Sequence, residues 1–261
     1  MIIATWNINS IRARIDTAVA WVKEANPDVL CLQEIKCETN SFPSTVFEDL
    51  GYNVIVHGQK SYNGVAILSK LKPEDVRRGL PGDDAESPAR YIEALFPAGS
   101  AMVRVASIYL PNGNPVGTEK YTYKLAWMDR LTLHARGLLA LEEPLVLAGD
   151  YNVIPAALDA KFPENWVTDA LFLPETRARY RIMQNLGLTD AVRAIMPDKP
   201  GIYSFWDYQA GAWQRNNGLR IDHLLLSPQA ADRLKTARID AHVRGWERPS
   251  DHVPVAIDIA E

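Results

Sequence analysis

The sequence predicts an α/β fold in which strands and helices are mixed along one chain. Short apolar runs such as Leu145–Ala148 are typical of buried strands, because helices need longer periodic segments. Other segments place apolar residues at helical spacing, and the longest of them is Glu119–Leu141. No repeat, low-complexity segment or linker divides the 261 residues. One domain covering residues 1–261 is therefore the simplest organisation.

The predicted strands are apolar or alternating segments, and Pro/Gly-rich joints such as Leu80–Gly82 separate several of them. In chain order they are Ile2–Asn9, Val29–Leu32, Asn53–Val56, Gly64–Ser69, Tyr91–Phe96, Met102–Tyr109, the run from Leu145, Ile221–Leu226 and a last strand that ends at Ile259.

Helices are predicted where apolar spacing is followed by a residue that ends a helix. Arg14–Glu24 is stopped by Pro27, and a short helix within Pro43–Leu50 is followed by Gly51. The remaining helices are Glu119–Leu141 and Glu175–Leu186. Residues 153–175 form a long loop, and residues 203–220 are aromatic and basic.

Composition is that of an ordinary globular protein. No apolar stretch approaches the roughly 18 residues of a membrane span. The first residues, Met1–Ala4, lack the charged region and cleavage site of a signal peptide. We therefore expect a cytoplasmic protein without a membrane partner. Cys31 lies in an apolar run and Cys37 in a polar loop, and neither a disulfide scaffold nor a zinc-ligand spacing results.

The net charge of −4 argues weakly against a nucleic-acid partner, but the charge is unevenly distributed. Residues 161–250 contain 13 Lys/Arg and 10 Asp/Glu, a balance of +3, so the remainder carries −7. An acidic metal site beside a basic rim would give this asymmetry, and so would chance.

The apolar run from Leu145 ends in Gly149, Asp150, Tyr151 and Asn152. Because side chains alternate along an extended chain, Asp150 and Asn152 should point the same way. An acid beside an amide can take up a proton and hold an oxygen atom. The alternative is an ordinary turn, since Asp and Asn are common turn formers.

Other strand ends and loops carry similar polar residues, namely Asn7, Glu34, Tyr109 with Asn112, Asp222, and Asp251 with His252. A lone Glu34 is more often a solvated acid, and Asp251 with His252 is compatible with a turn. Asp222 precedes a run of leucines, where a carboxylate needs a cation or a hydrogen-bond donor. Sites collect at strand ends, so together these residues predict an active site.

The residue types narrow the chemistry. The sequence has neither the G-x-S-x-G motif of serine hydrolases nor the phosphate-binding G-x-x-x-x-G-K-[ST] loop. Carboxylate and amide oxygens suit Mg²⁺ or Mn²⁺ better than zinc. A hard cation, an acidic base and a His–Asp pair together predict hydrolysis of a phosphate ester by activated water.

The ordered motifs resemble the exonuclease III family of AP endonucleases, within the endonuclease/exonuclease/phosphatase superfamily, over essentially the whole chain. They are Trp6-Asn7, Leu32-Gln33-Glu34, Tyr109-Leu110-Pro111-Asn112-Gly113, Gly149-Asp150-Tyr151-Asn152, Gly218-Leu219-Arg220-Ile221-Asp222 and Ser250-Asp251-His252. The resemblance implies a four-layer α/β sandwich like that of deoxyribonuclease I, with two packed sheets between helices. It also implies a monomeric base excision repair enzyme that binds double-stranded DNA with abasic sites or blocked 3′ ends. Such an enzyme cuts 5′ to the abasic site, and often has 3′→5′ exonuclease and 3′-phosphodiesterase activity.

The resemblance also implies roles for single residues. The magnesium site would be formed around Glu34, with Asn7, Asp150, Asn152 and Asp251. Asp150 would deprotonate the attacking water, with His252 and Tyr109 as the alternative bases, and Asn152 would orient that water and hold a phosphate oxygen. Asp222 would fix the tautomer of His252, and Tyr109 would contact the scissile phosphate. His223 should point away from the site, because it follows Asp222 on the same strand.

Substrate contacts are expected from two further groups of residues and from Asn112. Phe205, Leu219 and Ile221, with Trp206 behind them, would form an abasic pocket, although aromatic runs more often belong to a core. Leu219 stands where animal members have a larger aromatic residue. The basic rim would contain Arg177, Arg179, Arg181, Arg215, Arg220 and Arg248.

Two other functions remain open at this point. A phosphoinositide or sphingomyelin phosphodiesterase of the same superfamily would share the Glu, Gly-Asp-x-Asn and Ser-Asp-His motifs. The aromatic and basic segment 203–220 favours DNA over lipid. A catalytically inactive DNA-binding module is the alternative from another class, and the presence of every expected catalytic residue type argues against it.

Overall fold

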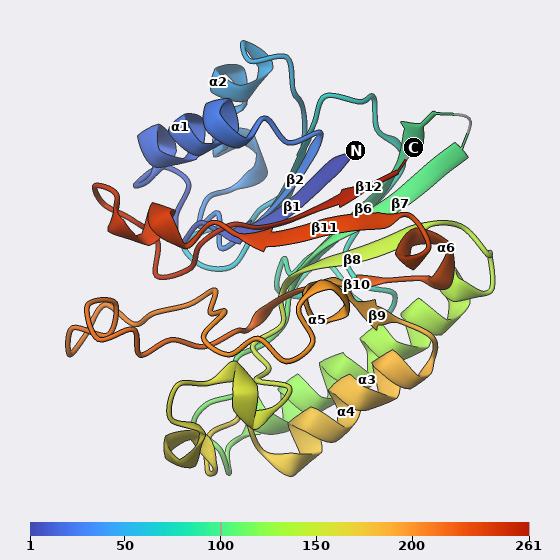
Figure 1. The fold of residues 1–261 in the computed structure, drawn as a ribbon. Helices are drawn as coiled ribbons and strands as arrows, with labels where there is room; N and C mark the ends of the chain where they lie inside the picture. Colours follow the sequence, from blue (N-terminus) through green and yellow to red (C-terminus); the bar gives the residue numbers. More distant parts are fainter. Residues whose placement is uncertain (100, 261) are drawn as a thin grey trace.

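Two six-stranded sheets pack face to face in the computed structural model, which describes residues 1–99 and 101–260 (Figure 1). Sheet A has the strand order β11-β12-β1-β2-β4-β3, and sheet B has the order β5-β6-β7-β8-β10-β9. Within sheet A only β1 and β2 are parallel, and within sheet B only β7 and β8 are parallel.

The strands of sheet A are β1 (Ile2–Asn7), β2 (Val29–Gln33), β3 (Asn53–His57), β4 (Val65–Ser69), β11 (Leu234–Ile239) and β12 (Val255–Ile259). Those of sheet B are β5 (Glu74–Arg78), β6 (Tyr91–Ala98), β7 (Ala101–Tyr109), β8 (Leu145–Asp150), β9 (Thr189–Asp190) and β10 (Asp222–Leu226). The central strands β2, β4, β8 and β10 are buried at every position, which explains why they are apolar rather than alternating.

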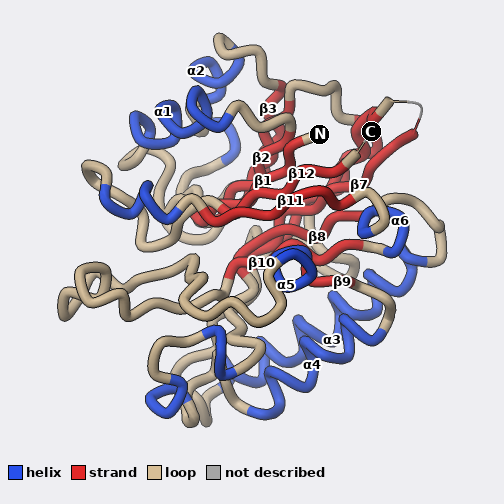
Figure 2. Tube along the Cα trace, viewed as in Figure 1, coloured by secondary structure: helices blue, strands red, loops and turns tan. Residues whose placement is uncertain are grey.

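Helices cover the outer face of each sheet, as Figures 1 and 2 show. On sheet A lie α1 (Ile15–Ala25) and α2 (Ser44–Glu48), and on sheet B lie α3 (Glu119–Leu139) and α4 (Pro174–Asn185). The short helices are α5 (Ala191–Ile195) and α6 (Pro228–Ala231). The predicted four-layer α/β sandwich is confirmed. No helix within the described ranges is both long and apolar enough to cross a membrane.

Three large apolar clusters hold the layers together. The inner cluster lies between the sheets, where Val29 and Cys31 of sheet A meet Val105 and Val146 of sheet B. A second cluster joins α1 to the outer face of sheet A through residues such as Trp21, and a third joins α3 to sheet B. Each fully buried aliphatic side chain contributes roughly 1.5–3 kcal/mol, so the sandwich depends mainly on these contacts.

Most predicted strands and helices are confirmed, and the differences have physical reasons. Strand β1 ends at Asn7 rather than at the predicted Asn9, because Asn9 and Ser10 have positive φ angles of 46° and 83°. Strands β5 and β11 were not predicted. Both have mostly exposed or half-buried side chains at a sheet edge, so they lack the apolar pattern that marks a strand.

Candidate active site

The ends of six strands meet at one edge of the sandwich. The parallel pairs β1–β2 and β7–β8 finish there, while the antiparallel strands β12 and β10 begin there. Asp150 is paired with Tyr109 on one side and with Asp222 on the other. Gly149 allows this close approach, because a Cβ at that position would collide with the backbone of Ile108. The predicted polar strand ends are therefore neighbours in space.

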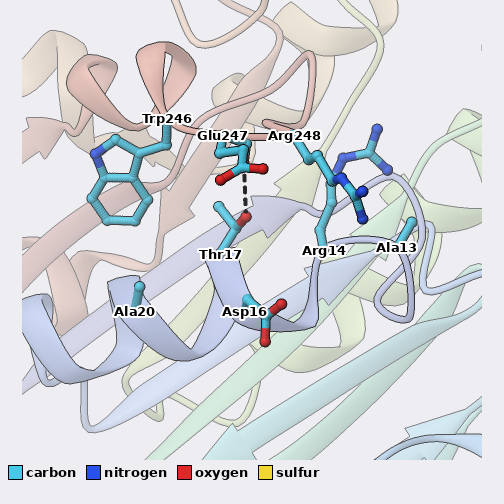
Figure 3. A pocket seen from close by; sticks show the side chains of 8 residues that line it. All are labelled: Ala13, Arg14, Asp16, Thr17, Ala20, Trp246, Glu247 and Arg248. Carbon is cyan, nitrogen blue, oxygen red and sulfur yellow. Dashed lines mark hydrogen bonds between the residues drawn. The ribbon is translucent and has the colours of Figure 1, made fainter.

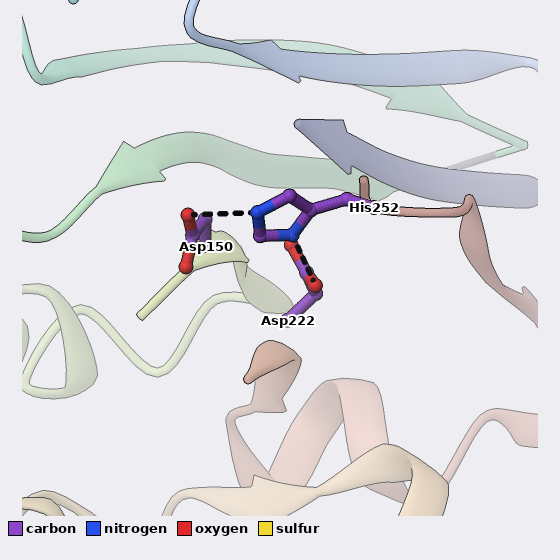
Figure 4. Close-up of side chains that lie close together, drawn as sticks. All are labelled: Asp150, Asp222 and His252. Atoms are coloured by element: carbon purple, nitrogen blue, oxygen red, sulfur yellow. Dashed lines mark hydrogen bonds and ion pairs between the residues drawn. The ribbon is translucent and has the colours of Figure 1, made fainter. Parts of the chain in front are cut away.

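His252 lies between two carboxylates from the opposite sheet (Figure 4). Its Nδ1 lies 2.8 Å from Oδ2 of Asp222, and its Nε2 lies 3.7 Å from Oδ2 of Asp150. The predicted pairing of Asp222 with His252 is confirmed. Ser204 donates its hydroxyl to the same Oδ2 of Asp222 at 2.6 Å. The sequence analysis missed Ser204, because a lone serine in an aromatic segment carries no signal of its own.

The acid–amide pair at the end of β8 is held by a turn and not by strand alternation. Oδ1 of Asp150 accepts a hydrogen bond from the backbone N–H of Asn152 at 2.9 Å, and Asn152 has a φ of 48°. The side chains do face the same cavity, as predicted. The predicted cause, alternation along a strand, is wrong. Strand β8 ends at Asp150, and an Asx turn then directs Asn152 towards the same cavity.

Burial and neighbouring charges set the protonation of this pair. Burial raises the pKa of Asp150 to about 7, with a further contribution from Asp222, although His252 opposes both. Burial alone would lower the pKa of His252, but the charges of Asp222 and Asp150 outweigh it and raise that pKa to about 10. A protonated imidazole cannot ligate a metal. The three groups have potential ligand atoms within 4.8 Å of one another; a hydrogen bond joins His252 to Asp222, and an ion pair joins it to Asp150.

Glu34 and Asp150 converge from the two sheets on one amide. Nδ2 of Asn7 donates to Oε1 of Glu34 and to Oδ2 of Asp150, both at 2.9 Å. The oxygen of Asn7 accepts from the backbone N–H of Asn9 at 3.0 Å. Asn7 therefore holds the two carboxylates together, and its expected place in the metal shell stays a prediction.

Glu34 is ionised and forms an ion pair with Lys36. Burial alone would raise its pKa, but hydrogen bonding by Asn7 and the charge of Lys36 outweigh this and hold the pKa below its ordinary value. Nζ of Lys36 lies 2.9 Å from Oε2 of Glu34. Asp251 lines the same cavity, and its Oδ1 accepts from Asn9 at 3.1 Å. An ionised Glu34, with the oxygens of Asp150 and Asp251 on the same cavity, forms the oxygen-rich donor set that fits Mg²⁺ or Mn²⁺.

Tyr109 is a phenol and not a phenolate. Burial, followed by the charges of Glu34 and Asp150, raises its pKa well above its ordinary value. The guanidinium of Arg90 lies 4.7 Å from the centre of its ring. Tyr109 can therefore donate a hydrogen bond into the cavity, but it cannot accept a proton from water at neutral pH.

The cavity of about 210 Å³ in front of these groups has one polar and one apolar wall. Predicted residues that line it are Glu34, Tyr109, Asn112, Asp150, Asn152, Phe205, Leu219, Ile221, Asp251 and His252. The ring of Phe205 lies edge-on to that of His252, with centroids 5.0 Å apart, and Leu219 and Ile221 belong to a small apolar cluster beside it.

Other wall residues differ from those expected. Trp206 does not line the cavity: it packs against Trp213, with centroids 4.9 Å apart, and belongs to the cluster of sheet A. Trp206 was expected behind Phe205, Leu219 and Ile221, and it lies off the cavity because Phe205 and Trp206 face opposite sides of their segment. Trp166 and Leu171 line the cavity instead, together with Asn114 and Asp207. The sequence analysis missed Trp166 and Leu171 because they lie in a loop without periodicity.

The predicted assignment of Arg220 to a surface rim is wrong. Its side chain is 1% exposed, and it makes ion pairs with Asp159 at 2.7 Å and with Asp190 at 2.8 Å. Asp159 and Asp190 are buried, and a buried carboxylate without a cation destabilises the fold. Arg220 is therefore needed in the interior to pair with them. His223 is confirmed as structural: its Nε2 faces the backbone oxygen of Val153 at 2.9 Å, away from the cavity.

The remaining rim arginines are partly or fully exposed. Two of them, Arg177 and Arg179, contact other side chains. Arg179 pairs with Asp129 at 2.9 Å, and Arg177 stacks on Phe172 at 4.4 Å. Arg248 is exposed beside a hollow of about 270 Å³ between α1 and residues 246–248, which Figure 3 shows. The other members, Arg181 and Arg215, are exposed.

Comparisons with known proteins agree with this geometry. The model of the Endonuclease/Exonuclease/phosphatase family matches residues 4–252. Exodeoxyribonuclease III of Haemophilus influenzae is 35% identical over 258 residues, which are 96% of this chain and 97% of that protein. A solved AP endonuclease from Archaeoglobus fulgidus aligns with a TM-score of 0.93 at 38% identity, over 99% of both chains. A 3′ phosphatase from Neisseria bound to a product DNA hairpin aligns with a TM-score of 0.95 at 37% identity, over 100% of both chains.

Proposed function

Because the chain belongs to the endonuclease/exonuclease/phosphatase family and is a nuclease of the exonuclease III type, we propose that it repairs DNA by cutting 5′ to abasic sites. The cut leaves a 3′-hydroxyl, and the same site removes blocking groups and nucleotides from 3′ ends. The observation that best supports this function is the position of His252 between Asp222 and Asp150 at the base of the cavity. We also propose that the chain forms a single domain and that the protein is monomeric and cytoplasmic.

The proposal includes one Mg²⁺, or Mn²⁺, on the oxygen ligands of Glu34, Asp150 and Asp251, with Asn152 beside them. Such an ion neutralises charge that develops on the phosphate. Asn7 keeps Glu34 and Asp150 together through its two hydrogen bonds of 2.9 Å. The donor set supports a hard cation, since the described part of the cavity contains no cysteine and its histidine is protonated.

Asp150 is the proposed general base. Burial raises the pKa of this carboxyl group, which favours its taking up a proton. Tyr109 and His252 are the alternative bases, and both hold a proton at neutral pH because their pKa values are raised. In this proposal the water gives its proton to Asp150, while His252 and Tyr109 donate hydrogen bonds to the phosphate oxygens.

Asn112 and Asn152 complete the polar wall. Nδ2 of Asn112 donates to Oδ1 of Asn152 at 3.1 Å, and Nδ2 of Asn152 donates to the backbone oxygen of Leu110 at 2.9 Å. This chain of hydrogen bonds fixes the orientation of both amides. We assign them to the phosphate and to the attacking water.

The apolar wall would select the abasic nucleotide. A sugar without a base can leave the helix cheaply, and a cavity of about 210 Å³ lined by Phe205, Leu219 and Ile221 excludes a nucleotide with its base. The name of the relative from Archaeoglobus fulgidus, an AP endonuclease, supports this substrate. The name of the relative from Neisseria, a 3′ phosphatase, supports the activity on 3′ ends.

The test uses a labelled duplex with one abasic site, a duplex with a 3′-phosphate, and vesicles containing phosphoinositide or sphingomyelin. We expect incision 5′ to the abasic site with Mg²⁺, a 3′-hydroxyl product, and no reaction in EDTA. Cleavage of the lipids alone would replace the proposal with a lipid phosphodiesterase. DNA binding without any product would replace it with an inactive binding module.

A further inference from the structure

Lys124 is buried in α3 directly beneath the polar wall of the cavity. Its side chain is 0% exposed, which is unusual for lysine. Lys124 is not one of the residues that line the cavity, and no step of the proposed reaction uses it. Moving a lysine side chain out of water costs free energy, which hydrogen bonds to nearby groups must offset. The hydrogen-bond partners of Lys124 therefore indicate its role.

Both hydrogen-bond partners of Nζ of Lys124 are backbone carbonyl oxygens of the site. Nζ donates to the oxygen of Asn112 at 3.0 Å and to the oxygen of Asn152 at 2.6 Å. Asn112 lies on the loop after β7, and Asn152 lies on the turn after β8. One side chain therefore connects the two loops whose amides face the cavity.

The stem of Lys124 also supports the first of these loops. A Cβ on Gly113, which has a φ of 88°, would lie 2.6 Å from Cδ of Lys124. The loop therefore rests directly on the methylene groups of the lysine. Asn152 has a left-handed backbone with a φ of 48°, so its orientation depends on contacts that hold the turn.

We infer that Lys124 is a positioning residue that fixes the amides of Asn112 and Asn152 in the orientation required by the proposed phosphodiester cleavage. The inference rests on the proposed function. Lys124 acts by donating hydrogen bonds to two backbone oxygens, and it touches neither the substrate nor the attacking water. A misplacement of about 1 Å in a positioning group can reduce turnover by roughly 10²-fold, so the loss of this connection should be measurable.

The first test replaces Lys124 with methionine, which has a similar length but no donor. Lys124→Met should lower kcat by roughly 10–100-fold, with a change of less than about threefold in KM and a melting temperature close to that of the wild type. Lys124→Gln keeps an amide donor and should lose less turnover than Lys124→Met. Arg136→Met, which removes an exposed cation from the same helix, is the matched control and should leave kcat unchanged.

The second test separates positioning from a general structural role through a double-mutant cycle in the single-turnover rate constant, measured with excess enzyme. If Lys124 acts through Asn152, Lys124→Met should reduce this rate constant by less than about threefold once Asn152 is already alanine. A merely structural lysine would reduce it by the same factor in both backgrounds, and that result would overturn the inference. If Lys124→Met does not fold, Lys124→Gln is used in the same cycle.

The two proposals fail in different ways. A wild-type protein that cleaves neither abasic nor 3′-blocked DNA contradicts the proposed function, and the inference falls with it. A wild-type protein that cleaves DNA, together with a Lys124→Met variant that is equally fast, contradicts the inference alone.

Discussion

Asp222 holds His252 through one carboxylate oxygen and leaves the other without a partner. Oδ2 lies 2.8 Å from Nδ1 of His252, whereas Oδ1 is buried and makes no hydrogen bond within the described residues. Asp222→Asn should lower turnover by roughly 10²–10⁴-fold, because a neutral amide no longer stabilises the charged imidazole. Single-turnover cleavage and DNA affinity should be measured together, with the exposed Asp232→Asn as control. Unchanged turnover would show that the pair is only structural.

The second prediction concerns the proton of the attacking water. Asp150→Asn keeps the size and most hydrogen bonds of the side chain, but it cannot accept that proton. Turnover should fall by about 10²–10⁴-fold, while the affinity for abasic DNA in EDTA stays within a few fold. A variant that loses DNA affinity and keeps its turnover would place Asp150 among the binding residues.

The third prediction concerns the metal. Glu34→Ala removes an ionised carboxylate at the end of β2, so it should weaken Mn²⁺ binding and abolish most Mg²⁺-dependent cleavage. Calorimetric titration of the DNA-free protein with Mn²⁺ measures the first effect independently of activity. Glu38→Ala, an exposed acid in the following loop, is the matched control. Wild-type Mn²⁺ affinity in Glu34→Ala would remove Glu34 from the metal site.

The fourth prediction concerns selection of the abasic nucleotide. Phe205→Ala removes the ring that packs on His252 and opens the apolar wall, so incision at an abasic site should fall more than Mn²⁺ affinity or melting temperature. Leu219→Ala should have the smaller effect, because less of the wall is removed. The pocket assignment fails if Phe205→Ala is fully active or unfolded.

The fifth prediction concerns stability against pH. Burial, and then the charge of Arg220, lower the pKa of His223 to about 4 in the folded protein, below its value of about 6.5 in an unfolded chain. Between these values the unfolded chain binds the proton more readily. The stability due to His223 is therefore complete above about pH 6.5 and is lost as the pH falls towards 4, by roughly 3 kcal/mol in total.

The measurement is the free energy of unfolding in urea at about pH 7.5 and about pH 5, for the wild type and for His223→Asn. Asp150 and His252 also titrate, but they are present in both proteins, so the difference between the two pH dependences isolates His223. The variant should lose less stability on acidification than the wild type. Equal losses would mean that folding does not lower the pKa of His223.

How far the sequence predicts the fold depends on which signals are local. The buried strands β2, β8 and β10 are visible as apolar runs, because each is covered on both faces. Edge strands β5 and β11 are not detectable as strands, since none of their residues is buried and so no apolar pattern marks them. Strand pairing between distant segments, such as β1 with β12, has no local signal, so the sandwich itself came from the family resemblance.

The site follows the same rule. Polar residues at the ends of apolar strands, such as Asp150 and Asp222, can be found because they interrupt a clear pattern. Trp166 ends a short 3-10 helix, Pro163–Trp166, that has no apolar periodicity, and Arg220 looks like any other cation in a basic segment. Only the fold shows that the first reaches the cavity and that the second is enclosed by two carboxylates.

The catalytic groups are divided between the two sheets: Glu34 follows β2 and His252 precedes β12 of sheet A, whereas Asp150 and Asp222 belong to β8 and β10 of sheet B. Neither sheet alone contains a working set, so catalytic competence can arise only after the sheets have docked through the apolar layer between them. Enzyme activity is therefore a reporter of the last step of assembly. A partly folded chain with native secondary structure but separated sheets would therefore have no nuclease activity.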